Sequence, residues 1–216
     1  MQEDNMSDFS DSFTIHTTLA PLPTTAYENY MRDGALANYR DGMNARVHTF
    51  RFEGQGDEVF KVTCCEPTTQ LFMWAYDSMA SGRLPPGIPS VKACHGLCAL
   101  DADGFQFEGF TVERLRPAET ERERGALRAL LVSARECRQR FEDRLPGSRS
   151  WQVSLRVARW LSLQNVGGLR DAVRVVAAVI KATRALLDIE QPGNVMFTKD
   201  GRLCLADPVA MSFSAP

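Results

Sequence analysis

The sequence has no large net charge, no long apolar run and no framework of paired cysteines, and each absence excludes a class of protein. The formal net charge is −2, so bulk electrostatics indicates neither a nucleic acid nor an anionic membrane as a partner. No apolar run is long enough to span a bilayer. The first thirty residues also lack the apolar segment of a secretory signal. We therefore expect a cytoplasmic protein without a membrane segment.

The cysteines are scattered along the sequence, which indicates free thiols and not a framework of disulfides. Without a secretory segment, we expect them to be reduced. The stretch "CHGLC" at 94–98 has the spacing C-x-x-x-C, and no second ligand pair follows it. Cysteines inside a strand therefore explain this stretch better than a zinc site does. The six positions are Cys64, Cys65, Cys94, Cys98, Cys137 and Cys204.

What is present reads as a globular α+β chain with three parts. Residues 1–30 are polar, acidic and interrupted by proline, which predicts a leader that is flexible or loosely docked. Residues 31–116 are rich in strand patterns and contain one helix. Residues 117–216 are helical and end in a short hairpin. The sequence therefore predicts two lobes, a β-rich N-lobe and a small helical C-lobe.

Local patterns predict the elements of both lobes. A helix should begin at Pro67 and stop at Gly82, because proline suits the first helical turn and glycine the residues after the last one. The many Glu and Arg residues of 122–144 predict a solvated helix face. The expected strands lie within 46–53, 58–63, 90–100 and 104–115, and the later helices within 118–145, 150–164 and 168–187.

The segment "DIEQPGNVMFTKDGRLCLADP", residues 188–208, carries the clearest chemical pattern. The runs "VMF" and "LCL" are short and apolar, as in strands, and Gly201 between them suits a tight turn. An antiparallel hairpin would bring Asn194, before the first strand, beside Asp207, after the second. An amide oxygen next to a carboxylate is a pair of hard ligands that suits Mg²⁺.

This order of elements resembles the protein-kinase fold. Proteins of that fold carry a lysine on the third strand, then a helix, two strands and further helices. A loop with a catalytic Asp and a metal-binding Asn follows, and a short hairpin leads to a second metal-binding Asp. The matching residues are Lys61 in "EVFKVT", Asn194 in "QPGNVMF" and Asp207 in "LADPVA".

More narrowly, three short islands resemble the early Ser/Thr protein kinase of lytic short-tailed phages. They contain "VFKV", "GRLPPGIPSV", and "DIEQPGNVMF" with "LADPVAMSFS", and the likeness covers about residues 35–213. The resemblance implies a two-lobed protein-kinase-like fold with a minimal, truncated C-lobe. It also implies ATP and Mg²⁺ as cofactors and host proteins as substrates in the cytoplasm of the host bacterium.

The resemblance also assigns roles to single residues. Lys61 would contact the phosphates of ATP, and Asn194 and Asp207 would hold the metal. Asp188 would orient or deprotonate the acceptor hydroxyl. In "YRDGMNARVH", Gly42 and Asn44 would cover the nucleotide.

The sequence departs from the family around the catalytic loop. The family places its catalytic Asp five residues before the metal-binding Asn, and here that place holds Ile189. Asp188 lies one residue too early and Glu190 one too late. Asp188 fits the role only if Pro192 marks an insertion of one residue, which we expect. Leu187 and Ile189 would then anchor the loop in the core.

Two further departures concern the nucleotide and the lysine. The nucleotide-covering loop should be rich in glycine, yet Gly42 is its only glycine. The helix should supply a Glu to pair with Lys61, but it offers only Glu66 at its start and Asp77 inside it. Few residues follow Asp207, so we expect no activation segment.

Three functions stay open at this point. The first is a Ser/Thr protein kinase, which the motifs favour. The second is a weak or dead kinase-fold protein, a pseudokinase, that binds and inhibits a host protein. The third is a small-molecule phosphotransferase of the aminoglycoside type, which shares the Asp and Asn pattern but usually has a larger helical substrate lobe.

Overall fold

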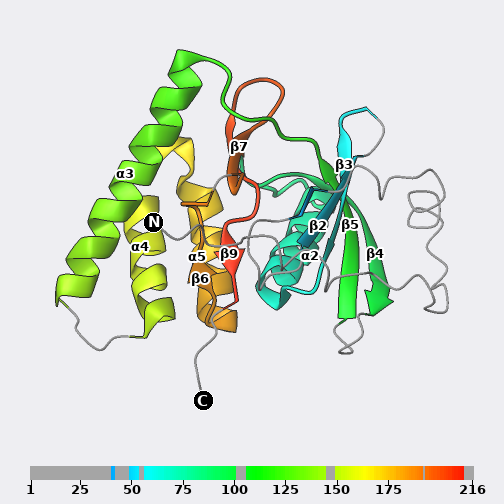
Figure 1. The fold of residues 1–216 in the computed structure, drawn as a ribbon, viewed down its shortest axis with the longest axis horizontal. Coiled ribbons are helices and arrows are strands. Elements are labelled where there is room, and N and C mark those ends of the chain that lie inside the picture. The colour runs from blue at the N-terminus through cyan, green and yellow to red at the C-terminus, as the bar shows by residue number, and fades with distance from the viewer. Residues whose placement is uncertain are drawn as a thin grey trace, which may run out of the picture.

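The computed structural model describes residues 40–41, 49–53, 56–100, 106–144, 149–191 and 193–211, with backbone alone at 40–41, 49–53 and 99–100. These residues form a mixed α/β structure. A β-sheet with one helix lies on one side, three helices lie on the other, and a small hairpin lies between them (Figure 1). The predicted leader 1–30, Gly42, Asn44 and Pro192 lie outside the described residues.

The sheet is five-stranded, in the order β1-β2-β3-β5-β4, and its neighbours are antiparallel. Strand β3 lies at its centre, with Lys61 opposite Arg51 of β2 and Phe110 of β5. Residues 59–63 of β3 are buried, so Lys61 starts from a rigid position. The strands are β1 (Arg40–Asp41), β2 (Thr49–Glu53), β3 (Glu58–Thr63), β4 (Val91–Leu100) and β5 (Gln106–Glu113).

Helix α2 (Glu66–Ala80) follows β3 and packs against the sheet. Pro67 lies in its first turn, and Gly82, just beyond its end, has a φ of +67° that suits glycine. The prediction of this helix is therefore confirmed. Its inner face buries Thr68, Leu71, Phe72 and Ala75.

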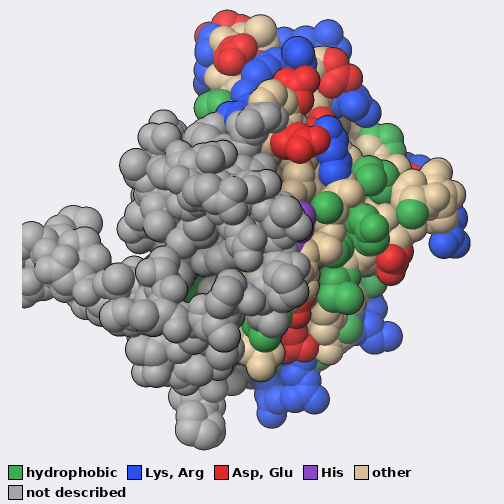
Figure 2. Space-filling model, turned by 90° about the vertical axis from the view of Figure 1, so that its right-hand side faces the viewer, with side chains coloured by type: hydrophobic (Ala, Val, Ile, Leu, Met, Phe, Trp, Pro, Cys, Tyr) green, Lys and Arg blue, Asp and Glu red, His purple; other side chains and the backbone are tan. Residues whose placement is uncertain are grey.

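The outer face of α2 carries apolar side chains at the surface, namely Met73, Trp74 and Tyr76. The view onto the sheet side of the molecule shows hydrophobic side chains gathered in one part, with Lys and Arg along the margins (Figure 2). Since Thr68 and Phe72 are buried, α2 turns one face to the core and the other to the surface.

The remaining helices are α3 (Glu121–Arg144), α4 (Ser150–Gln164) and α5 (Arg170–Thr183), with a short 3₁₀ turn η2 (Val166–Gly168) before α5. A single hydrophobic cluster joins residues of the sheet and α2 to residues of α3, α4 and α5. None of the helices in the described part of the chain combines the length and apolar character that crossing a bilayer requires.

The predicted helix over 168–187 is wrong at its end. Helix α5 stops at Thr183, and Arg184 adopts a left-handed φ of +58°. Leu186–Leu187 then form strand β6, which pairs with β9 (Val209–Ala210). This pairing is with residues more than twenty positions away, so helical periodicity could not reveal it.

The hairpin of β7 (Val195–Phe197) and β8 (Leu203–Leu205) is antiparallel, with Val195 opposite Leu205, as predicted. All six cysteines are free thiols, and Cys94 and Cys98 lie on strand β4. Burial raises the pKa of Cys204 to about 12, which keeps this residue a thiol inside the hairpin.

Candidate functional site

The open end of the β7–β8 hairpin brings Asn194 and Asp207 together. The carbonyl oxygen of Asn194 accepts hydrogen bonds from the backbone N–H of Ala206 at 2.8 Å and of Asp207 at 3.2 Å. The hairpin therefore places the two residues side by side, as the sequence predicted.

Lys61 reaches this end of the hairpin from strand β3. Its Nζ donates to the carbonyl oxygen of Ala206 at 2.9 Å and lies 3.9 Å from Oδ2 of Asp207. Lys61 is only 8% exposed, and a buried ammonium group requires such partners. The structure thus joins Lys61 to Asp207, although the two lie far apart in the sequence.

Helix α2 contributes two residues that sequence reasoning missed. Thr68 is fully buried, and its Oγ1 donates to Oδ1 of Asp207 at 3.1 Å. The ring of Phe72 lies one turn further on, with its centroid 5.1 Å from Nζ of Lys61, a cation–π contact. Neither residue type signals this role in the sequence, because both contacts depend on how α2 packs.

The acidic residues of α2 do not form the ion pair with Lys61 that the resemblance required. Glu66 accepts a hydrogen bond from Gln70, and Asp77 is exposed. Among the described residues, Asp207 forms an ion pair with Lys61 instead.

Asp188 lies beside Asn194 and Asp207. Its backbone N–H donates to the carbonyl of Pro208 at 2.9 Å, and Nδ2 of Asn194 donates to its carbonyl oxygen at 2.6 Å. Leu187 and Ile189 on either side are buried in the main core, which confirms that they anchor the loop. Ile189 therefore points into the core, whereas the Asp188 carboxylate lies near Asp207.

The pKa of Asp188 reflects this position. Burial raises the pKa of its carboxyl group, and the negative charge of Asp207 raises it further. A hydrogen bond from the Asn194 side chain and the positive charge of Arg138 act in the opposite direction. Two carboxylates thus converge at a partly buried point.

Glu190 points away from this point and binds helix α3. Its carboxylate accepts from Nε of Arg135 and from Nε of Arg138, both at 3.1 Å, and Arg138 also donates to the carbonyl of Leu187 at 3.1 Å. The predicted solvated face of 122–144 holds for Arg135, which is 63% exposed, whereas Arg138 is only 27% exposed. Both arginines hold the loop that carries Asp188.

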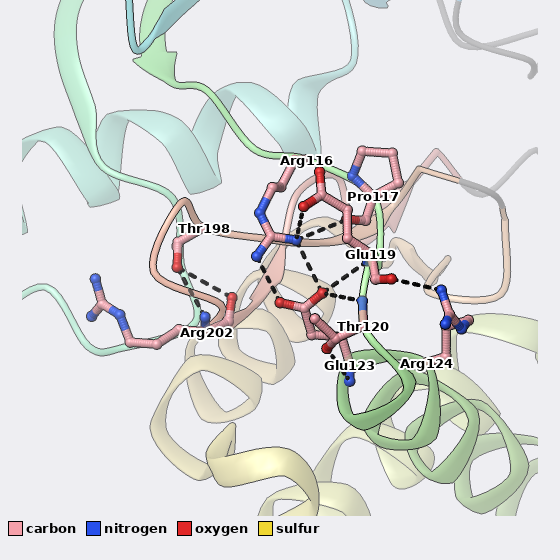
Figure 3. A network of polar contacts seen from close by, with 8 residues as sticks. All are labelled: Arg116, Pro117, Glu119, Thr120, Glu123, Arg124, Thr198 and Arg202. Atoms are coloured by element: carbon pink, nitrogen blue, oxygen red, sulfur yellow. Dashed lines mark hydrogen bonds and ion pairs between the residues drawn. The ribbon is translucent and has the colours of Figure 1, made fainter.

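The other end of the hairpin is fixed by a network around Arg116 and Glu123 (Figure 3). Arg116 donates to both carboxylate oxygens of Glu123, at 3.0 and 2.6 Å. Glu123 also accepts from the backbone N–H groups of Glu119 and Thr120 at the start of α3. The bonds from Arg116, followed by those from the backbone, lower the pKa of Glu123 to about 2.

Arg116 also pairs with the hairpin through its backbone. Arg116 and Phe197 exchange two N–H to carbonyl hydrogen bonds of 2.8 Å. The hairpin is therefore held between the end of the sheet and the start of α3, and this fixes where its open end lies.

The side chains at the open end have the chemistry of a magnesium site. Asp188, Asn194 and Asp207 offer carboxylate and amide oxygens, and a divalent cation would offset the repulsion between the two carboxylates. Within the described ranges, no three side chains among His, Cys, Asp and Glu converge as a metal site. A metal here would thus complete its shell with water or phosphate.

Comparison with known proteins adds little. Neither protein-family models nor curated proteins match the chain. Among solved structures, an aminoglycoside phosphotransferase from Streptomyces rimosus is similar at 17% identity, over 87% of this chain and 74% of that chain, with a TM-score of 0.30. A TM-score this low does not establish a shared fold, so the two-lobed kinase-like arrangement remains a prediction.

Proposed function

We propose that this chain is a phosphotransferase with a two-lobed protein-kinase-like fold, which transfers the γ-phosphoryl group of ATP to Ser or Thr residues of host proteins. One observation carries the proposal. Lys61 of β3, Asp207 after β8, and Asp188 with Asn194 before β7 converge at the open end of one hairpin. A lysine and hard oxygen ligands at one point are what phosphoryl transfer needs.

Each residue has a role in this reaction. Asp207 and Asn194 would hold Mg²⁺, which neutralises charge on the β- and γ-phosphates when bound. Lys61 would exchange its bond to the Ala206 carbonyl for the phosphates. Asp188 would accept the proton of the attacking hydroxyl, and its raised pKa favours that step over an ordinary Asp.

A protein as acceptor is supported by the resemblance of the sequence islands to the phage Ser/Thr kinase. The resemblance also supports the host cytoplasm as the place of action. The pseudokinase alternative is supported by the environment of Lys61, because its buried amine is bonded to a backbone carbonyl and faces the ring of Phe72.

The test is incubation of the chain with γ-labelled ATP, Mg²⁺ and a bacterial lysate. Label should enter proteins with wild type and disappear with Asp207→Asn. Asp200→Asn is the matched control, because Asp200 lies in the turn of the same hairpin and is 63% exposed.

The outcomes separate the candidates. Label that enters only small molecules would favour the small-molecule phosphotransferase. If nothing is labelled but Mg–ATP raises the melting temperature of wild type and not of Asp207→Asn, the binding protein is favoured. Absence of both label and melting shift would end the proposal.

A further inference from the structure

We propose that Thr68 is a positioning residue that ties helix α2 to the metal ligand Asp207. The inference rests on the proposed function, since it assumes that Asp207 holds a cation. The Thr68 hydroxyl is fully buried and donates to Oδ1 of Asp207 at 3.1 Å, across 139 positions of sequence.

A threonine hydroxyl in a helix commonly bonds to a carbonyl of the preceding turn. The hydroxyl of Thr68 instead donates to a group outside the helix, the carboxylate of Asp207. A hydroxyl has one hydrogen to donate and two lone pairs to accept. Its one hydrogen is therefore committed to Asp207.

The two oxygens of Asp207 have different partners. Thr68 holds Oδ1, and the amine of Lys61 lies 3.9 Å from Oδ2. The carboxylate is thus restricted in rotation before a cation arrives. Groups that orient a metal ligand in this way typically change metal affinity or activity by about 10- to 100-fold when they are removed.

Helix α2 contacts both charged groups of the site from one face. Thr68 reaches Asp207, and Phe72, four residues later on the same face, lies against the amine of Lys61. A shift of α2 would therefore alter the lysine and the metal ligand together. The position of this helix is coupled to the site through a hydroxyl and a ring.

The test compares Thr68→Val, which keeps the shape but loses the hydroxyl, with Thr68→Ser, which keeps the hydroxyl. Mn²⁺ serves as the probe, and its binding is measured from the free-ion spin-resonance signal with a non-hydrolysable ATP analogue present. We expect Thr68→Val to weaken Mn²⁺ binding about 10- to 100-fold, and Thr68→Ser by less than about threefold. Thr69→Val, in the same helical turn, is the matched control and should match wild type.

Each outcome decides something. Failure of wild type to bind Mn²⁺ would remove the proposed function itself. Wild-type binding by a folded Thr68→Val variant would overturn the positioning role and leave the function intact. If Thr68→Val does not fold, Thr68→Ala replaces it, and its Mn²⁺ affinity relative to Thr68→Ser is interpreted by the same criteria.

Discussion

The two ends of the β7–β8 hairpin hold carboxylates in opposite ways. At the turn, Glu123 accepts two bonds from Arg116 and two from backbone N–H groups. At the open end, Asp207 receives the Thr68 hydroxyl, lies 3.9 Å from the Lys61 amine, and lies near the negative charge of Asp188. The turn also requires glycine, since a Cβ on Gly201 would lie 3.0 Å from a Glu123 oxygen at a φ of +79°.

Under the proposed function, this difference separates a structural carboxylate, Glu123, from the carboxylates that would act in the reaction. Hydrogen-bond donors of the protein lower the pKa of Glu123 to about 2, so they already stabilise its negative charge. Burial and the charge of Asp207 instead raise the pKa of Asp188. A cation would therefore add little stabilisation to Glu123 at the turn, but much to Asp188 and Asp207 at the open end.

Replacing Asp207 with Asn should have the largest effect. We expect the affinity for Mg–ATP to fall by more than about 100-fold, because the proposed ligand to the metal is lost. Wild type should gain about 2.7 kcal/mol of stability at a hundredfold excess of Mg–ATP over Kd, and the variant almost none. Melting curves with and without Mg–ATP measure this, and an unchanged shift in the variant would contradict the assignment.

Replacing Glu123 with Gln should lower the stability of the protein but leave the effect of Mg–ATP unchanged. The melting temperature should fall more than in any other variant of this set, because the substitution leaves Arg116 with a neutral partner in a buried place. The rise caused by Mg–ATP should remain. Glu121→Gln is the control, since Glu121 is 86% exposed and pairs only with Arg124 among the described contacts. Loss of the nucleotide effect in Glu123→Gln would abolish the distinction between the two ends.

Acid should lower the stability of wild type through Glu123, at the turn end of the hairpin. The folded pKa of Glu123, about 2, lies below its usual 4.5, so its contribution is present above the unfolded pKa and is lost as pH falls toward the folded one. Between about pH 5 and pH 2.5, wild type should therefore lose more stability than Glu123→Gln does. Parallel curves for the two proteins would show that the pair does not govern this loss.

Replacing Asp188 with Asn should have the smallest effect on stability, and a positive one. The raised pKa of Asp188 means that its ionised form costs the folded state stability at all pH values above the folded pKa, and that this cost vanishes below the unfolded pKa. Without nucleotide, the melting temperature at neutral pH should rise by about 1–4 °C. Asp171→Asn, at an exposed position on α5, should leave it unchanged. A fall in Asp188→Asn would indicate a structural role instead.

The elements with local signals could be predicted from the sequence. Pro67 and Gly82 mark helix α2, and Gly201 marks the hairpin, because each acts through its own backbone geometry. The proximity of Asn194 and Asp207 follows from the hairpin alone. The end of α5 could not be predicted, because strand β6 depends on pairing with a distant strand.

The site could be predicted only in part for the same reason. Lys61 is identified through a resemblance. The resemblance predicts an acidic partner from helix α2, whereas Asp207, which follows β8, pairs with Lys61. Thr68 and Arg138 carry no pattern in the sequence, since their contacts to Asp207 and Leu187 form when helices pack. The conformation at Gly42, Asn44 and Pro192 lies outside the described residues.

The bond between Lys61 and Ala206 spans 145 positions of the chain, and this has a consequence for folding. Contacts between such distant residues require the closure of a long loop, so they tend to form after local helices and hairpins. We expect the sheet and helix α5 to gain protection from hydrogen exchange early in refolding, and the amides of Ala206 and Asp207 to gain it last. Early protection of those two amides would show a different order. If the order holds, the proposed nucleotide site is complete only in chains that have finished folding.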